Sequence, residues 1–176
     1  MQKKYLIKIS PLIFLLAIIF SLPSLGFSQS VSGVNGEQVI HGNVAFDRSV
    51  ANELRINASS DRSIVNYNSF SIAQNETVRF NLPQATSAIL NRVVGVNPSE
   101  ILGSIVSNGQ VFLTNPNGVI FGQNARVDMP ALVASTLDIS NENFLSGNYQ
   151  FQKVPGKNGY IINRGQITIK NGGYVC

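Results

Sequence analysis

A four-residue turn, Asn115-Pro116-Asn117-Gly118, is the feature that most constrains what this chain can fold into. Runs of β-branched and aromatic residues flank it at 110–114 and 119–122. Proline fixes φ near about −65°, and asparagine and glycine accept positive φ at low steric cost, so the segment predicts two strands joined by a tight corner. None of its side chains is a nucleophile, a general base or a metal ligand. The segment therefore favours a role in shaping the backbone over catalysis.

The first 28 residues have the pattern of a secretory signal peptide. Three lysines precede an apolar run over 9–20, and small residues occupy positions 26 and 28, before the expected cleavage site. This run is too short for a confident membrane span, although an uncleaved membrane anchor is the alternative. Cleavage removes three of the 13 lysines and arginines, which leaves ten against nine acidic residues. With a net charge of about +1 and scattered arginines, nucleic-acid binding is not supported.

The chain has few residues that carry chemistry. Cys176 is the only cysteine and His41 the only histidine. No internal disulfide can form, and histidine-rich metal sites and most acid–base catalysis are excluded. Asp128, Asp138 and Glu142 are too far apart in the sequence to indicate a calcium loop. We therefore expect no enzyme, no metal site and no cofactor.

The pattern of short apolar runs favours a β-solenoid. Asparagine is the most frequent residue after the expected leader, and Asn/Gly turns separate short runs of valine, isoleucine and phenylalanine. Three such turn–strand units follow one another at 158–162, 163–169 and 171–175. Units of unequal length fit the rungs of a parallel β-helix, with an antiparallel sandwich as the alternative. Segments 87–94 and 97–100 are weakly helical, and we expect at most one helical turn there.

Five stretches in a fixed order carry a resemblance to a known family. They lie at 63–72, 90–93 (Leu-Asn-Arg-Val), 97–103, 108–122 and 132–139. Over roughly 36–175 the chain resembles the amino-terminal secretion domain of two-partner-secretion exoproteins of the filamentous haemagglutinin type. Tyr67 departs from the family pattern, where a tryptophan is expected.

The resemblance implies an all-β fold, a right-handed parallel β-helix with an amino-terminal cap. We expect a signal peptide at 1–28, a short linker at 29–36 and the β-helical secretion domain at 37–176. The resemblance also implies a Gram-negative envelope, in which an outer-membrane transporter with periplasmic modules and a barrel reads the domain in the periplasm. The exoprotein, an adhesin or toxin, then folds at the cell surface. Because the pattern breaks off at Cys176, we expect a fragment whose passenger, with any host-surface ligands, is missing.

Two sets of site residues follow from the resemblance. The first set either contacts the transporter or shapes a β-helix corner, and it comprises Asn115, Pro116, Asn117, Gly118, Asn66 and Asn68. The second set is structural and comprises Tyr67, Phe70, Phe112 and Phe121. Arg92 is expected to pair with Glu100 or Asp128, or to be solvated. The alternative function is a stand-alone adhesive or carbohydrate-binding module, in which Tyr149, Tyr160 and Tyr174 stack on sugars.

Overall fold

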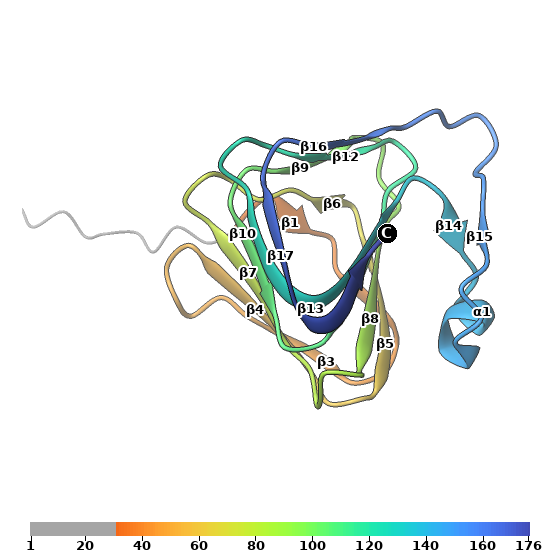
Figure 1. Ribbon diagram of the computed structural model, residues 1–176, viewed down its shortest axis with the longest axis horizontal. Helices are drawn as coiled ribbons and strands as arrows, with labels where there is room; N and C mark the ends of the chain where they lie inside the picture. Colours follow the sequence, from red (N-terminus) through yellow and green to blue (C-terminus); the bar gives the residue numbers. More distant parts are fainter. Residues whose placement is uncertain (1–30) are drawn as a thin grey trace, which may run out of the picture.

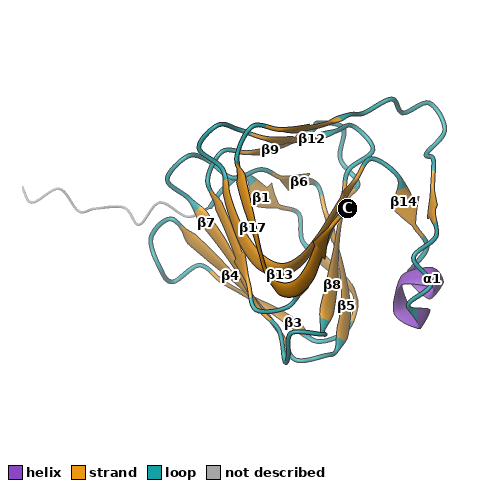
Figure 2. Cartoon of the chain, in the orientation of Figure 1, coloured by secondary structure: helices purple, strands orange, loops and turns teal. Residues whose placement is uncertain are grey.

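The computed structural model describes residues 31–176, so the expected leader at 1–28 lies outside the described residues. Short strands joined by tight turns make up most of this part of the chain (Figure 2). They wind into a solenoid that is triangular in cross-section (Figure 1). Each side of the triangle is a stack of strands from successive rungs.

The rungs are built from strands of three to six residues at most positions. The first rung comprises β4 (Glu53–Ala58), β5 (Arg62–Tyr67) and β6 (Ser69–Phe70), the second β7 (Thr77–Asn81), β8 (Ala88–Val93) and β9 (Ser99–Ile101), and the third β10 (Ser104–Ser107), β11 (Gln110–Thr114) and β12 (Val119–Phe121). The fourth rung comprises β13 (Arg126–Ser135), which bends across two sides, and β16 (Ile161–Asn163). Beyond it, β17 (Gln166–Val175) stacks on β13. Pairing between these rungs is parallel, which confirms the predicted β-helix and excludes the sandwich.

The core fills the inside of the triangle. Along one side, Leu54, Val78, Ile105, Val127 and Ile167 stack in register on successive rungs. The first four are at most 2% exposed, and Ile167 packs against the same cluster. Because side chains alternate between the two faces of a strand, the residues between them point outward. The alternation seen in the sequence therefore corresponds to inside and outside of one continuous core.

An antiparallel cap closes the amino-terminal end. It comprises β1 (Val34–Asn35), β2 (Gln38–His41) and β3 (Val44–Asp47), which pair antiparallel with β6, β5 and β4 respectively. All sides of the first rung are thus covered at an edge that would otherwise expose backbone donors and acceptors. The described part of the expected linker, 31–36, belongs to the cap, because Val31 and Val34 are 0% and 1% exposed and lie in the core.

An arm leaves the solenoid between β13 and β16 and folds back on its outer side (Figure 1). It contains β14 (Asp138–Ile139), α1 (Asn141–Ser146) and β15 (Phe151–Gln152). Segments 87–94 and 97–100, for which at most one helical turn was predicted, contain none, and strands β8 and β9 take up most of them. Helix α1 instead begins after Ser140, whose hydroxyl accepts a hydrogen bond from the Asn143 amide. It ends at Gly147, whose backbone has a left-handed conformation. Among residues 31–176, no helix is long and apolar enough to cross a membrane.

Candidate functional site

The Asn115–Gly118 segment forms a corner between β11 and β12. The Gly118 amide donates to the Asn115 carbonyl at 3.0 Å, which closes a β-turn. Gly118 has φ +127°, a conformation that residues with a Cβ rarely adopt. A Cβ there would also lie 3.1 Å from the Tyr160 carbonyl oxygen of the next rung. Glycine is therefore required both by the backbone and by the close approach of that rung.

The Asn115 side chain is fully buried and uses every hydrogen-bonding position that it has. Its Nδ2 donates to the Asn97 carbonyl and to Ser99 Oγ, both at 3.0 Å. Its Oδ1 accepts from the backbone amide of Asn117 at 2.9 Å and from Asn117 Nδ2 at 3.1 Å. Asparagine is suited to this position because one amide offers both donors and acceptors. The side chain thereby fixes the corner onto the second rung.

The Asn117 side chain, which is half-buried, extends this network to two other segments. Its Nδ2 donates to the Gly95 carbonyl at 2.9 Å, on the second rung. Its Oδ1 accepts from Lys157 Nζ at 2.8 Å, in the segment that returns from the arm. Gly95 in turn lies so close to the first rung that a Cβ would be 1.9 Å from the Asn68 carbonyl oxygen. Asn68, Gly95 and Asn117 therefore form one column along the solenoid.

Rung four covers the other side of the corner. The Gly159 amide donates to the Pro116 carbonyl at 3.2 Å, and the Val119 amide donates to the Tyr160 carbonyl at 3.0 Å. Pro116 and Asn117 are half-buried, whereas Gly118 is buried. In the folded domain the corner thus presents little side-chain surface, and its contacts are almost all internal.

The remaining predicted partner residue, Asn66, lies on β5 and contacts Arg92, its neighbour on β8. Its Oδ1 accepts from Arg92 Nη1 at 3.3 Å. Arg92 Nε also donates to Asp138 Oδ1 at 2.8 Å, so the expected pairing with Glu100 or Asp128 is wrong. Asp128 instead lies 3.6 Å from Lys170 Nζ. The sequence missed Asp138 as a partner because the arm brings it back from 46 positions away.

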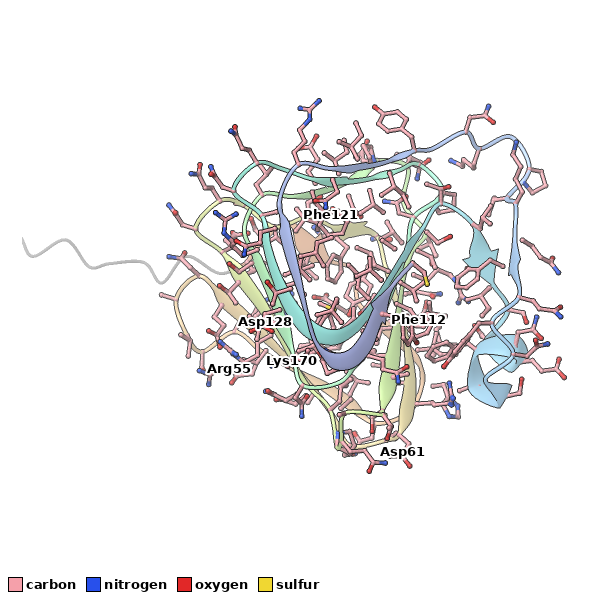
Figure 3. All side chains as sticks on the ribbon, viewed as in Figure 1. Arg55, Asp61, Phe112, Phe121, Asp128 and Lys170 are labelled. Atoms are coloured by element: carbon pink, nitrogen blue, oxygen red, sulfur yellow. The ribbon has the colours of Figure 1, made fainter. Side chains whose placement is uncertain are left out.

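The structural aromatics divide between the inside and the outside of the solenoid. Tyr67, Phe70 and Phe121 are at most 1% exposed and lie in the central core, and the rings of Tyr67 and Phe70 meet edge to face at 5.2 Å. Phe112 is equally buried but belongs to a second cluster beneath the arm (Figure 3). Inside the core, the Tyr67 hydroxyl donates to Asn91 Oδ1 at 3.0 Å. Burial raises the pKa of Tyr67 well above its ordinary value of 10.0.

Charged groups lie mainly on the outer surface. Glu53 accepts from Arg55 Nε at 2.7 Å and from Arg79 Nε at 3.3 Å, across two rungs. The Arg55 hydrogen bond lowers the pKa of Glu53 below its ordinary value. Among residues 31–176, no three or more histidine, cysteine or acidic side chains lie close enough to hold a metal ion. The corner therefore offers shape and hydrogen bonds, which suit recognition or folding.

Comparison with known proteins finds matches to this chain in sequence and in structure. A family model described as the TPS secretion domain matches residues 32–175. A heme/hemopexin-binding protein of Haemophilus influenzae is 35% identical over 116 residues, which are 66% of this chain but 12% of that protein. A second such protein of the same species is 37% identical over 121 residues, which are 67% of this chain and 13% of that protein. Our chain thus spans only a small part of these relatives.

A solved structure shares the fold. The HMW1 secretion domain from Haemophilus influenzae superposes with a TM-score of 0.78 at 40% sequence identity. The match covers 81% of this chain and 38% of that one. The solenoid described above is therefore the architecture of a secretion domain whose structure is known.

Proposed function

Because this chain belongs to the TPS secretion domain family, we propose that a dedicated outer-membrane transporter recognises it in the periplasm. The chain is a secretion-targeting domain of the kind found in two-partner-secretion exoproteins. The family is described as a secretion domain, and we propose that the domain has no catalytic activity. We further propose that residues 1–28 direct the chain to the periplasm and are removed there.

The burial of Asn115 carries the proposal about how the transporter reads the domain. This side chain is 0% exposed, and all of its polar atoms are bonded within the domain. A transporter that contacts it directly must therefore meet the chain before the corner has formed. An extended chain can add as a strand to the edge of a periplasmic module, where main-chain hydrogen bonds give affinity and alternate side chains give specificity.

The column of residues that includes the corner would serve a second purpose after export. Asn68, Gly95 and Asn117 connect three rungs, and the cap covers the edge of the first one. Once such a nucleus has formed at the cell surface, each further rung needs only to stack on a completed edge. We propose that the domain nucleates folding of a longer exoprotein of the adhesin or toxin type.

Co-expression with the cognate transporter tests this function. Export of the domain to the medium is measured for Asn115→Ala and Asn117→Ala against Asn124→Ala, a control in the exposed turn before β13. We expect export to fall for the two corner variants and to stay at the parent level for the control. Equal export of all variants would exclude the corner as the signal.

A binding measurement separates recognition from folding. The purified periplasmic modules of the transporter are titrated with the domain held unfolded in urea and with the domain folded. We expect the modules to bind the unfolded chain more tightly, and Asn115→Ala to weaken that binding. Tighter binding of the folded domain, unaffected by Asn115→Ala, would show that a folded surface is recognised and that the corner acts through folding alone.

The alternative of a sugar-binding module is less well supported. Of its three tyrosines, Tyr149 packs on the Phe112 ring at a centroid distance of 4.8 Å. The Tyr174 hydroxyl donates to Gln110 Oε1 at 3.1 Å, and Tyr160 is 60% exposed. Two of the three are thus engaged within the domain. Saturable binding of the purified domain to an immobilised glycan, lost in Tyr160→Ala, would restore this alternative.

A further inference from the structure

An apolar row runs along the outer face of one side of the solenoid. Ile64, Leu90, Phe112 and Val133 occupy the same register position on β5, β8, β11 and β13. They belong to a cluster separate from the central core, and each is at most 7% exposed. A row of this kind on the outer face of a sheet would face water unless another segment covered it.

The arm covers this row with its own apolar side chains. Ile139 and Phe144 are 1% and 0% exposed, and Phe144 meets Phe112 edge to face at 5.2 Å. Tyr149 contacts Phe112 from a second direction, and Leu145 and Phe151 pack at the margin of the cluster. The arm therefore shares one apolar cluster with side chains from four successive rungs.

Two arginines of the solenoid hold the arm in place. Arg62, from the first rung, donates from Nη1 to the Phe144 carbonyl and to the Tyr149 hydroxyl, both at 2.9 Å. Its guanidinium lies 5.7 Å from the centroids of both aromatic rings. Arg92, from the second rung, binds Asp138, the Ile139 carbonyl and Asn141 Oδ1. These contacts are made by side chains of the solenoid.

The backbone of the arm is organised differently from that of the rungs. β14 and β15 pair with each other, and each has two residues. Helix α1 has six residues, of which Phe144 alone is buried. A helix of this length is not stable without its packing partners. The inner rung strands β7, β8, β10, β11 and β12, in contrast, are each hydrogen-bonded to a neighbouring strand on both sides.

We infer that residues 138–152 form a latch that opens as a unit while the solenoid stays folded. Closure joins four rungs that are otherwise connected only to their neighbours, and opening uncovers the Ile64–Leu90–Phe112–Val133 row. Segments with few buried side chains and little backbone pairing to their surroundings open by such local unfolding. The latch therefore sets whether this face of the domain is apolar or polar. This inference does not depend on recognition by a transporter.

Hydrogen exchange of the folded domain, with a fluorescent dye that binds exposed apolar surface, tests the latch. Phe144→Ala removes the ring that fills the cluster, and we expect amides of α1 to exchange about a hundredfold faster while those of β8 and β11 keep their protection. Dye binding should rise in parallel. Glu142→Gln, at an exposed position in the first turn of the same helix, is the matched control. It removes only a favourable charge at the helix N-terminus, so exchange in α1 should rise by no more than about fivefold and dye binding should stay at the parent level.

A milder variant covers the case in which Phe144→Ala does not fold. Tyr149→Phe removes the hydroxyl that accepts from Arg62 and keeps the ring, so we expect the same change in α1 with a smaller amplitude. The opposite result is that amides of α1, in the parent and in Tyr149→Phe, exchange at the same rate as those of β8 and β11 and with the same dependence on denaturant. In that case the arm unfolds with the solenoid and there is no latch.

Discussion

Replacement of Asn115 by alanine tests whether the buried corner stabilises the solenoid. The substitution removes four hydrogen bonds. The bond to Ser99 Oγ is fully buried, and Ser99 itself is 0% exposed, so its hydroxyl loses a partner without gaining water. A net loss of about 1.5 kcal/mol for that bond and about 0.5 kcal/mol for each of the three part-buried ones gives about 3 kcal/mol.

The assay is equilibrium unfolding of the purified domain in urea and by heat. For a domain of this size, about 3 kcal/mol corresponds to a fall in Tm of roughly 6–12 °C. Asn124→Ala, in an exposed turn, should unfold within about 0.5 kcal/mol of the parent. If Asn115→Ala also unfolded within that limit, the reasoning from burial and satisfied hydrogen bonds would be refuted.

Three further predictions concern the backbone and two titrating groups. Gly118→Ala should lower the free energy of unfolding by about 1 kcal/mol more than Gly156→Ala, because only Gly118 has a neighbour, at 3.1 Å, in the way of a Cβ; thermal unfolding checks this. The Arg55 hydrogen bond lowers the pKa of Glu53 below 4.5, so the unfolded chain binds this proton at a higher pH than the folded domain does. The free energy of unfolding therefore falls as pH decreases from about 4.5 through the lowered pKa. Glu53→Gln should flatten this part of a profile of the urea midpoint against pH. Burial raises the pKa of Tyr67 above 10.0, so the free energy of unfolding falls as pH rises past that value. Ultraviolet titration should show Tyr67 ionising only with unfolding. Tyr67→Phe should remove this pH dependence and lower the free energy of unfolding at neutral pH by about 1–2 kcal/mol, because Asn91 Oδ1 loses its donor.

Local features of the fold could be predicted from the sequence. Val78 and Phe80 of β7 and Leu82, one residue beyond this strand, alternate in the sequence, and all three are buried in the central core. The Asn/Gly-rich corner was equally visible, because it depends on the φ preferences of its own residues. Local rules of this kind determine where strands and turns lie, and the parallel β-helix followed from the resemblance to a family.

The contacts between distant segments could not be predicted. Phe112 sits between the inward-facing Val111 and Leu113, and its outward position makes sense only once the arm covers it. The partner of Arg92 depends on the same arm, and helix α1 was missed although Ser140 and Gly147 are its two caps. Val31 and Val34 look like linker residues because the residues that they pack with lie far along the chain, and Val34 pairs with Phe70.

The corner residues show the same division. That Asn115 and Asn117 shape a turn follows from their residue types, whereas their bonds to Asn97 and Gly95 depend on how the third rung stacks on the second. Stacking places residues about one rung apart in contact, and a pattern within a single rung carries no information on that register. The sequence therefore could not show which of these side chains are buried, and burial is what distinguishes a contact within the domain from a surface for a partner.

Export that depends on a transporter is the most direct test of the secretion role. The domain, with its leader, is produced in a Gram-negative host with the cognate transporter and without it, and the amounts in the medium and in the periplasm are compared. We expect the domain in the medium only when the transporter is present, and degraded or retained in the periplasm when it is absent. Equal amounts in the medium in both hosts would contradict recognition by a dedicated transporter.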